Sequence, residues 1–578
     1  MRKLLPYLKG YEKESILGPL FKLLEACLEL IVPIIMAAII DTGIQSRNIS
    51  YILSMGGILV LLGILGLCAS VTAQYYAAKA AFGFGTALRR DMFAHINRLS
   101  FSELDHAGLS SLITRITVDI NQAQAGVNLA LRLFLRSPFI VIGALIMAFT
   151  IHVQIACIFA ITVPVLGLVI YLVMGTSIPI YKKAQKKLEN VSLITRENLT
   201  GIRVIRAFSR QHEEQERFQG ANRELKKLQI LAGKVSALMN PLTYVLVNAA
   251  IILVMWQGAS VVNQGGITQG EVIALVNYMT QILLALIAFA QLIVTFTRGT
   301  ASAARVNEIM ELTPSMTDQG NQPQNPVPGA PKVEMKDIDF FYQGSPEPAL
   351  QNISFTAMPG ETIGVIGGTG SGKTSLISLI PRFYDIAKGV VLIDGRDVRD
   401  YPLSQLRGKL GIVPQSAVLF RGTIRENMQW RKKDATDEEI YRALEIAQAK
   451  EIIDSKEGGL NAWVAQGGKN FSGGQRQRLT IARALVGNPE ILILDDSASA
   501  LDFATDAKLR QAIAEKTSGI TVFMVSQRVF SIRNADRILV LDDGKLAGIG
   551  THDQLLQTCP VYREICLSQL SEEEVKQA

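Results

Sequence analysis

Six apolar stretches, each close to the length needed to cross a lipid bilayer, occupy the first half of this 578-residue chain. A transmembrane helix requires about 20 consecutive, mostly apolar residues. Charged residues are only 19% of the chain and hydrophobic residues 49%, a balance that is unusual for a soluble protein. We therefore predict an all-α, six-span transmembrane domain over residues 1–312. The predicted spans lie at about 16–40, 52–75, 134–151, 155–174, 238–262 and 272–297.

The connections between these stretches alternate in length and charge. The short ones contain a single Lys or Arg, Arg47, and the two long ones, at about 76–133 and 175–237, are rich in Lys and Arg. Positive charge is retained on the cytoplasmic side of membranes. We therefore expect a multi-pass protein of the cell membrane, with both termini and the C-terminal half in the cytoplasm. Because the basic residues already serve this topology, no nucleic-acid partner is expected.

The long connections keep a helical period without proline, so the spans are expected to continue as long cytoplasmic helical extensions. Each pair of extensions needs a turning element at its tip. The candidates are 101–111 and 198–209. Ordinary solvated helical hairpins are the alternative interpretation.

Several polar residues in the spans are candidates for the substrate cavity. Lys22, Glu25 and Glu29 are spaced three and four apart, so they share one helix face. Lys22 and Glu25 lie near the cytoplasmic end, where pairing or snorkelling explains them. Glu29 lies near mid-span, where a carboxylate is costly unless it faces protein or water. We hypothesise that Glu29 contacts a cationic substrate, with a hydrogen bond to another span as the alternative. Asn277 and Gln281 are weaker candidates.

A glycine-rich phosphate-binding motif, GGTGSGKT, begins at Gly367, between an apolar strand-like run and a helical pattern. Glycines allow consecutive backbone N–H groups to surround phosphate oxygens at a helix N-terminus. Lys373 would reach the β- and γ-phosphates, and the Thr374 hydroxyl would bind Mg²⁺. The predicted ATP contacts of this segment are Gly367, Gly368, Thr369, Gly370, Ser371, Gly372, Lys373, Thr374 and Ser375.

Further motifs follow a Pro- and Gly-rich linker at 313–331, within an α/β pattern over residues 332–578. Tyr342 is a candidate to stack on adenine, with an ordinary core aromatic as the alternative. Asp495 ends the strand-like run ILILD and, with Thr374 and Gln415, is a predicted Mg²⁺ ligand. A second phosphate cradle is predicted at the helix start FSGGQ: Phe471, Ser472, Gly473, Gly474 and Gln475.

The order GGTGSGKT, VPQ, FSGGQ, ILILD and SALD after six spans resembles an ATP-binding-cassette exporter half-transporter over essentially the whole chain. This resemblance implies that two chains pair head to tail, with each ATP between one chain's phosphate loop and the other's FSGGQ segment. It identifies the D-loop as Ser499, Ala500, Leu501 and Asp502. It also favours 101–111 and 198–209 as coupling helices docked on nucleotide domains, the first of them on the partner chain's domain.

Two positions depart from the competent form of this family. After the Mg²⁺ aspartate the family usually has Glu, which orients the attacking water, and this chain has Asp496. The switch position, usually His, is Gln527. The Asp carboxylate falls short by roughly an ångström, and a displacement of that size can cost about a hundredfold in rate. Gln can hydrogen-bond to a γ-phosphate but cannot carry the charge or proton of His. Both changes together predict weak hydrolysis.

FSGGQ, in contrast, is intact. An intact FSGGQ segment in a chain with Asp496 and Gln527 resembles one half of heterodimeric bacterial multidrug exporters. The resemblance therefore implies a partner chain that carries the catalytic Glu and the switch His, with a small lipophilic or cationic substrate. The alternatives are a homodimeric exporter of lipid or peptide in which Asp496 is active, and a non-transporting regulatory subunit that senses ATP.

Overall fold

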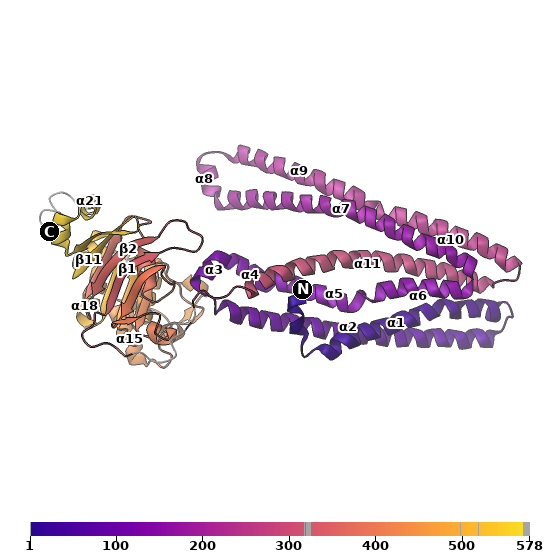
Figure 1. Ribbon diagram of the computed structural model, residues 1–578, viewed down its shortest axis with the longest axis horizontal. Coiled ribbons are helices and arrows are strands. Elements are labelled where there is room, and N and C mark those ends of the chain that lie inside the picture. The colour runs from indigo at the N-terminus through magenta and orange to yellow at the C-terminus, as the bar shows by residue number, and fades with distance from the viewer. Residues whose placement is uncertain (1, 317, 319–324, 498, 518, 570–578) are drawn as a thin grey trace. The chain divides into compact units, whose positions relative to one another are not determined.

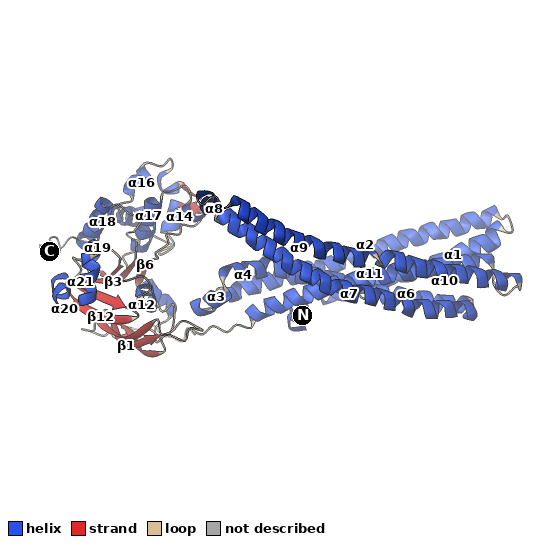
Figure 2. Cartoon of the chain, turned by 90° about the horizontal axis from the view of Figure 1, so that it is seen from above, coloured by secondary structure: helices blue, strands red, loops and turns tan. Residues whose placement is uncertain are grey.

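The computed structural model describes residues 2–316, 318, 325–497, 499–517 and 519–569 (Figures 1 and 2). The chain forms two compact units. The first comprises Met1–Asn97 and Ser110–Glu311, and the second comprises Arg98–Leu109 and Leu312–Ala578. Parts of the predicted linker and of the predicted C-terminal domain lie outside the described residues, at 317, 319–324, 498, 518 and 570–578.

The first unit is helical, and among the described residues six of its helical runs are long and apolar enough to cross a membrane. The predicted six-span, all-α domain is therefore confirmed. Each run extends beyond the apolar stretch that predicted it, because hydropathy marks only the lipid-exposed part of a helix. The runs are Glu12–Ile44, Ile49–Ile96, Leu109–Ile151, Val153–Thr200, Gln211–Asn263 and Gln269–Met310.

Several of these runs consist of more than one helix. The elements of the first unit are η1 (Arg2–Leu8), α1 (Glu12–Ala38), η2 (Ile39–Ile44), α2 (Ile49–Ile96), α4 (Leu109–Thr114), η3 (Arg115–Asp119), α5 (Ile120–Leu133), α6 (Arg136–Ile151), α7 (Val153–Thr200), α8 (Ile202–Ala207), α9 (Gln211–Ala237), α10 (Met239–Asn263) and α11 (Gln269–Met310).

Small residues bring the first two spans close together. Ala69, Ala73, Ala77 and Ala81 recur every four residues along α2 and are all buried. Gly18 of α1 faces this row, since a Cβ atom placed on it would lie 3.3 Å from the backbone nitrogen of Ala77. In lipid, where hydrophobic association is weak, such close packing of small residues holds helices together. Figure 1 shows α1 and α2 lying side by side.

The second unit is an α/β domain. Its elements are α3 (Phe101–Ala107), β1 (Val333–Phe340), β2 (Leu350–Ala357), β3 (Thr362–Gly367), α12 (Lys373–Leu379), β4 (Lys388–Ile393), β5 (Arg396–Asp397), α13 (Leu403–Gly408), β6 (Leu410–Val413), β7 (Gly422–Thr423), α14 (Ile424–Met428), α15 (Asp437–Ile446), α16 (Lys450–Asp454), η4 (Gly459–Asn461), β8 (Trp463–Val464), η5 (Gln466–Gly468), α17 (Gly473–Leu485), β9 (Ile491–Asp495), α18 (Phe503–Lys516), β10 (Thr521–Val525), α19 (Val529–Ile532), β11 (Arg537–Asp542), β12 (Lys545–Gly550), α20 (His552–Thr558) and α21 (Pro560–Leu567).

Two principal sheets organise this unit. In the described residues one sheet has the strand order β12-β11-β3-β10-β9-β6, and strands β11 to β6 in this order are parallel. The other sheet is antiparallel, in the order β2-β1-β4-β5. Strands β9 and β10 are buried at every position, as expected for parallel strands covered on both faces. The predicted α/β P-loop domain is therefore confirmed.

An ionic network ties the two sheets together. Lys332 and Lys409 each contact the carboxylates of Asp394 and Glu490. Lys332 precedes β1 of the antiparallel sheet, whereas Lys409 and Glu490 precede β6 and β9 of the parallel sheet. Burial raises the pKa of Asp394, but the hydrogen bonds and charges of the two lysines prevail, so its pKa lies below its usual value. The balance of two positive and two negative charges makes burial of Lys332, Lys409 and Asp394 tolerable.

Short helices occur at both tips where the sequence predicts turning elements. The prediction that the first would dock on the partner chain's domain is wrong, because α3 belongs to the same compact unit as this chain's own nucleotide domain. The Phe101 ring lies 4.5 Å from that of Phe383, and the Tyr384 hydroxyl donates to Asp105 at 2.6 Å. Motif order alone does not show on which chain a coupling helix docks.

The second tip, α8, presents an apolar surface. Val204 is 60% exposed and Phe208 73% exposed, and no residue of this helix is buried. Exposed apolar side chains on an otherwise charged helical arm are typical of interaction surfaces.

Candidate functional site

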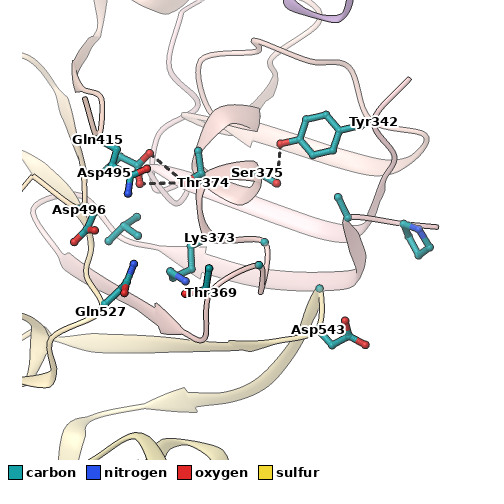
Figure 3. A pocket seen from close by; sticks show the side chains of 16 residues that line it. Tyr342, Thr369, Lys373, Thr374, Ser375, Gln415, Asp495, Asp496, Gln527 and Asp543 are labelled. Atoms are coloured by element: carbon teal, nitrogen blue, oxygen red, sulfur yellow. Dashed lines mark hydrogen bonds between the residues drawn. The ribbon is translucent and has the colours of Figure 1, made fainter. Parts of the chain in front are cut away.

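A cavity of about 400 Å³ lies at the carboxyl ends of four neighbouring parallel strands (Figure 3). Gly367 ends β3 and Asp495 ends β9, while Gln415 and Gln527 each follow two residues after β6 and β10. Ligands of open α/β sheets bind at this edge. The lining residues are Tyr342, Pro348, Ala349, Thr369, Gly370, Gly372, Lys373, Thr374, Ser375, Gln415, Asp495, Asp496, Val525, Gln527, Asp543 and Gly544.

The loop from β3 to α12 requires glycine at two crowded positions. Gly372 has a φ of +93°, in the left-handed region, and a Cβ there would lie 2.9 Å from the carbonyl oxygen of Ala349. At Gly367 a Cβ would lie 2.2 Å from the carbonyl oxygen of Leu541. These positions hold the loop tightly between β2 and β11, so its backbone N–H groups and the N-terminus of α12 are fixed at the cavity.

Lys373 carries the positive charge of this loop. The residue is 9% exposed, and its Nζ donates to the carbonyl oxygens of Gly367 at 3.0 Å and Gly368 at 2.6 Å. Burial lowers the pKa of Lys373, while the nearby carboxylates of Asp496 and Asp495 favour its charged form. An ammonium group in this position is suited to bind phosphate oxygens.

The residues predicted to hold Mg²⁺ come together on one side of the cavity. The Thr374 hydroxyl lies 3.2 Å from both carboxylate oxygens of Asp495, and Gln415 lies beside them (Figure 3). Hydroxyl, carboxylate and amide oxygens are hard donors of the kind that Mg²⁺ prefers, usually together with water and phosphate oxygens. The donor set therefore fits the predicted ion. Burial raises the pKa of Asp495, and the adjacent Asp496 adds to this effect.

The two unusual residues lie next to each other (Figure 3). Asp496 follows β9 with a φ of 44°. Its backbone N–H donates to the carbonyl oxygen of Val525 in β10 at 3.0 Å. Burial raises the pKa of the Asp496 carboxyl, whereas hydrogen bonding from Gln415 and the charges of Lys373 and Arg528 lower it. The register of β9 and β10 pairs Asp495 with Val525, which places Asp496 and Gln527 at adjacent strand ends.

Tyr342 lines the cavity at the end that also contains the start of α12. Its hydroxyl forms a 2.8 Å hydrogen bond with Ser375, and its ring packs edge-on against Phe340 and Tyr384. The residue is 37% exposed and lines the cavity, so it remains accessible to a ligand. This position agrees with the predicted adenine contact, which stays a prediction.

The FSGGQ residues lie apart from this cavity: none of them is among the described residues that line it. Ser472 is the N-cap of α17 and forms a capping box with Gln475, in which the Ser472 N–H donates to Gln475 Oε1 at 3.0 Å. Phe471 is buried and anchors the turn. A Cβ on Gly473 would meet no atom within 4 Å, so the backbone here is open to an approaching molecule.

The predicted D-loop, residues 499–502, contacts both Asp496 and the FSGGQ segment at the start of α17. The Ser499 hydroxyl donates to the carbonyl oxygen of Asp496 at 2.9 Å, and Asp502 caps α18 by accepting from Thr505. A Cβ on Gly474 would lie 3.3 Å from the carbonyl oxygen of Ala500. Leu501 is buried nearby. The segment after Asp496 therefore packs on the start of α17.

Residues that sequence reasoning missed include Asp543 and Gly544. Both have positive φ, 45° and 73°, as required by a two-residue hairpin turn between β11 and β12. The Gly544 N–H donates to the carbonyl oxygen of Ser371 at 3.3 Å. The dipeptide Asp-Gly was a visible turn signal, but its contact with the phosphate loop spans more than 150 residues and depends on the β11–β3 pairing.

In the first unit, the Glu29 carboxylate accepts a hydrogen bond from Arg136 of α6 at 2.7 Å. Lys22 pairs with Glu25, as the sequence predicts. Asn277 donates to the carbonyl oxygen of Ile273, and the buried Gln281 Oε1 has no hydrogen-bond partner among the described residues. The pair between α1 and α6 favours the structural alternative for Glu29, and contact with a cationic substrate stays a prediction.

Substitution of Glu29 distinguishes these two roles. Glu29→Gln leaves the partly buried Arg136 charge unpaired within the spans, so we expect the free energy of unfolding to fall by about 2 kcal/mol. Thermal unfolding in detergent measures this change, and Glu29→Gln/Arg136→Gln, which removes both charges, should recover most of it. A single variant of unchanged stability that no longer exports a cationic dye would instead assign Glu29 to the substrate.

Comparison with known proteins places this architecture in a family. Residues 15–286 match the family described as "ABC transporter transmembrane region", and residues 350–499 match "ABC transporter". An uncharacterized ABC transporter ATP-binding protein of Bacillus subtilis is 36% identical over 573 residues, or 99% of each chain. An ATP-dependent lipid A-core flippase of Hahella chejuensis is 31% identical, covering 99% of this chain and 97% of that protein.

The fold also matches a solved structure, that of a bacterial Atm1-family ABC exporter with ATP bound. The TM-score is 0.78 and the identity 24%, and the match covers 97% of this chain and 99% of that chain. This likeness shows a shared fold.

Proposed function

Because this chain belongs to the ABC transporter family, with its membrane and nucleotide-binding regions fused, we propose that it is the slow-hydrolysing half of a heterodimeric exporter. The family assigns ATP-driven transport across a membrane to the pair. The observation that carries the asymmetry is the lining of the cavity. It includes six of the nine predicted ATP contacts of the phosphate loop, all but Gly367, Gly368 and Ser371, together with Asp496 and Gln527 where the family usually has Glu and His.

The phosphate loop supports binding of ATP at this cavity. Lys373 and the backbone N–H groups of the loop bind the phosphates, and Tyr342 contacts adenine. Mg²⁺, held by Thr374, Asp495 and Gln415, would neutralise charge on the β- and γ-phosphates. The short Asp496 carboxylate does not reach the attacking water, and Gln527 hydrogen-bonds to the γ-phosphate without supplying a proton. This site therefore retains ATP and turns it over slowly.

The exposed start of α17 supports a contribution of this chain to the nucleotide site of its partner. Ser472 and Gly473 lie outside this chain's own cavity, and the backbone at Gly473 is open, as required of a segment that completes the partner's site. The partner supplies Glu and His there, and that site performs most of the hydrolysis. The nucleotide domains lie in the cytoplasm, because the Lys- and Arg-rich arms point to that side.

Transport follows from a population shift between two states. Two ATP molecules favour closed nucleotide domains, and the coupling helices move with them, so the membrane cavity changes from inward to outward access. The α3 helix moves with this chain's own domain through Phe101 and Asp105. The exposed apolar tip at α8 docks on the partner's domain. Hydrolysis at the partner's site resets the cycle. The substrate is a small lipophilic or cationic compound.

A second candidate is a homodimeric lipid exporter, which the similarity to a lipid A-core flippase favours. In that case two copies of Asp496 act as catalytic residues.

Co-purification from the native host separates the two candidates. An affinity-tagged copy of this chain, extracted in mild detergent, is expected to bring down a second half-transporter with Glu and His at the two positions. Replacement of that partner's Glu by Gln is expected to abolish ATP turnover by the complex. Recovery of a homodimer with robust, substrate-stimulated ATPase activity would overturn the heterodimer proposal.

A further inference from the structure

A glutamine after the C-terminal helix contacts the backbone that carries Gln527. Gln569 Nε2 donates to the carbonyl oxygen of Gln527 at 2.7 Å, and Gln569 Oε1 accepts from the N–H of Val529 at 2.9 Å. One primary amide thus makes a two-point contact on either side of Arg528. The NH2 group of the Gln569 amide pairs with a backbone carbonyl, and its oxygen pairs with a backbone N–H. A neighbouring β-strand would offer the same donor and acceptor.

The contacted segment lies between two fixed points, since the Ser526 N–H donates to the carbonyl oxygen of Val365 at 3.1 Å and Val529 is fully buried. Gln527 lies beyond the end of β10, and Val529 begins α19, where the first N–H groups have no partner within the helix. The Arg528 N–H donates to Ser526 Oγ at 2.9 Å, and the Arg528 guanidinium lies over the Phe503 ring. The Arg528 N–H and the Gln527 carbonyl belong to one peptide unit, so Ser526 and Gln569 hold this peptide from its two sides. Loss of the Gln569 bonds would leave only the Ser526 bond on this peptide, and a change in its orientation would move the Gln527 side chain within the cavity.

The backbone of Gln569 is anchored by α21, which packs against the core of the domain. Tyr562 of α21 is fully buried and its hydroxyl lies 2.6 Å from His552 Nδ1. Cys566, one turn further, is also fully buried, and the Gln569 N–H donates to its carbonyl oxygen at 3.0 Å. Although the Gln569 side chain is exposed, its backbone is therefore held against the domain core.

We propose that Gln569 is a positioning residue that holds Gln527 toward the γ-phosphate, so that the C-terminal helix sets the preference of this site for ATP over ADP. This inference rests on the proposed role of Gln527. It concerns only this chain's own cavity, so it does not depend on the identity of the partner. Because ADP has no γ-phosphate, its affinity should not depend on where Gln527 points.

The test uses the purified full chain in lipid nanodiscs, with a non-hydrolysable ATP analogue and ADP as the two probes. Gln569→Ala is expected to weaken binding of the analogue about tenfold, corresponding to the loss of about 1.4 kcal/mol, and to leave ADP binding unchanged. Gln569→Glu keeps the size and the acceptor but loses the donor, so it should behave like Ala. Ser568→Ala, at a neighbouring exposed position, is the matched control and should bind both nucleotides normally.

A double-variant cycle distinguishes positioning from support of the fold. In a Gln527→Ala background, Gln569→Ala should cause no further loss of analogue binding, because the side chain that it positions is gone. Equal losses for ADP and the analogue, or additive effects of the two substitutions, would overturn the inference. Normal analogue binding by Gln569→Ala alongside weak binding by Gln527→Ala overturns this inference only. Normal binding by Gln527→Ala overturns the proposed role of Gln527 as well.

Discussion

Asp496→Glu combined with Gln527→His is expected to raise ATP turnover at this chain's own site by about ten- to a hundredfold. The longer carboxylate of Glu would reach the attacking water, and His would supply the charge and proton that Gln lacks. The cavity has room for both changes, because Asp496 is only partly buried and Gln527 is exposed. The measurement is ATPase activity of the heterodimer in which the partner's Glu is replaced by Gln, so that only this site contributes.

Each single substitution is the control for the pair. Asp496→Glu alone should restore part of the activity, because the longer carboxylate reaches the water while Gln527 can still hydrogen-bond to the γ-phosphate. Gln527→His alone should restore little. A double variant with the turnover of the unmodified chain would show that the slow rate has another cause, and it would remove the physical basis of the proposed asymmetry.

The second large effect is expected from Gly473→Asp. In this chain the substitution is tolerated, because a Cβ at Gly473 meets no atom within 4 Å and an acidic residue is favourable in the first turn of a helix. In the proposed dimer, however, the new carboxylate would face the phosphates bound by the partner. We expect turnover by the heterodimer to fall at least about a hundredfold, the size of effect seen when a contact to developing charge is lost.

The comparison that gives this result its meaning uses the partner's equivalent glycine. That residue would contact the slow site, so its replacement by Asp should reduce turnover far less. Gly220→Asp, at a helical glycine of this chain with equally open surroundings, controls for the added charge. Equal losses of ATP turnover from Gly473→Asp and from the same substitution at the partner's equivalent glycine would indicate two equivalent sites. That result would favour the homodimeric alternative.

Local sequence was sufficient for the parts of this protein that depend on neighbouring residues. The six apolar runs predict the membrane helices, because the need to bury about 20 apolar residues in lipid acts on each run separately. The glycine motif predicts the strand, loop and helix around Lys373, because positive φ at Gly372 and the helix N-terminus are local requirements. Asp496 and Gln527 were identified through the resemblance to exporter half-transporters, whose motif order implies Glu and His at these two positions.

Contacts between distant segments were decided only by the tertiary structure. The α3 helix joins this chain's own domain through Tyr384, although 279 residues separate Asp105 from Tyr384. Glu29 meets Arg136, and Gln569 meets the Gln527 segment, across 107 and 42 residues. No local pattern predicts these pairs, since their partners are chosen by how helices and strands pack. Sequence therefore determined which groups this protein possesses, and packing determined which of them act together.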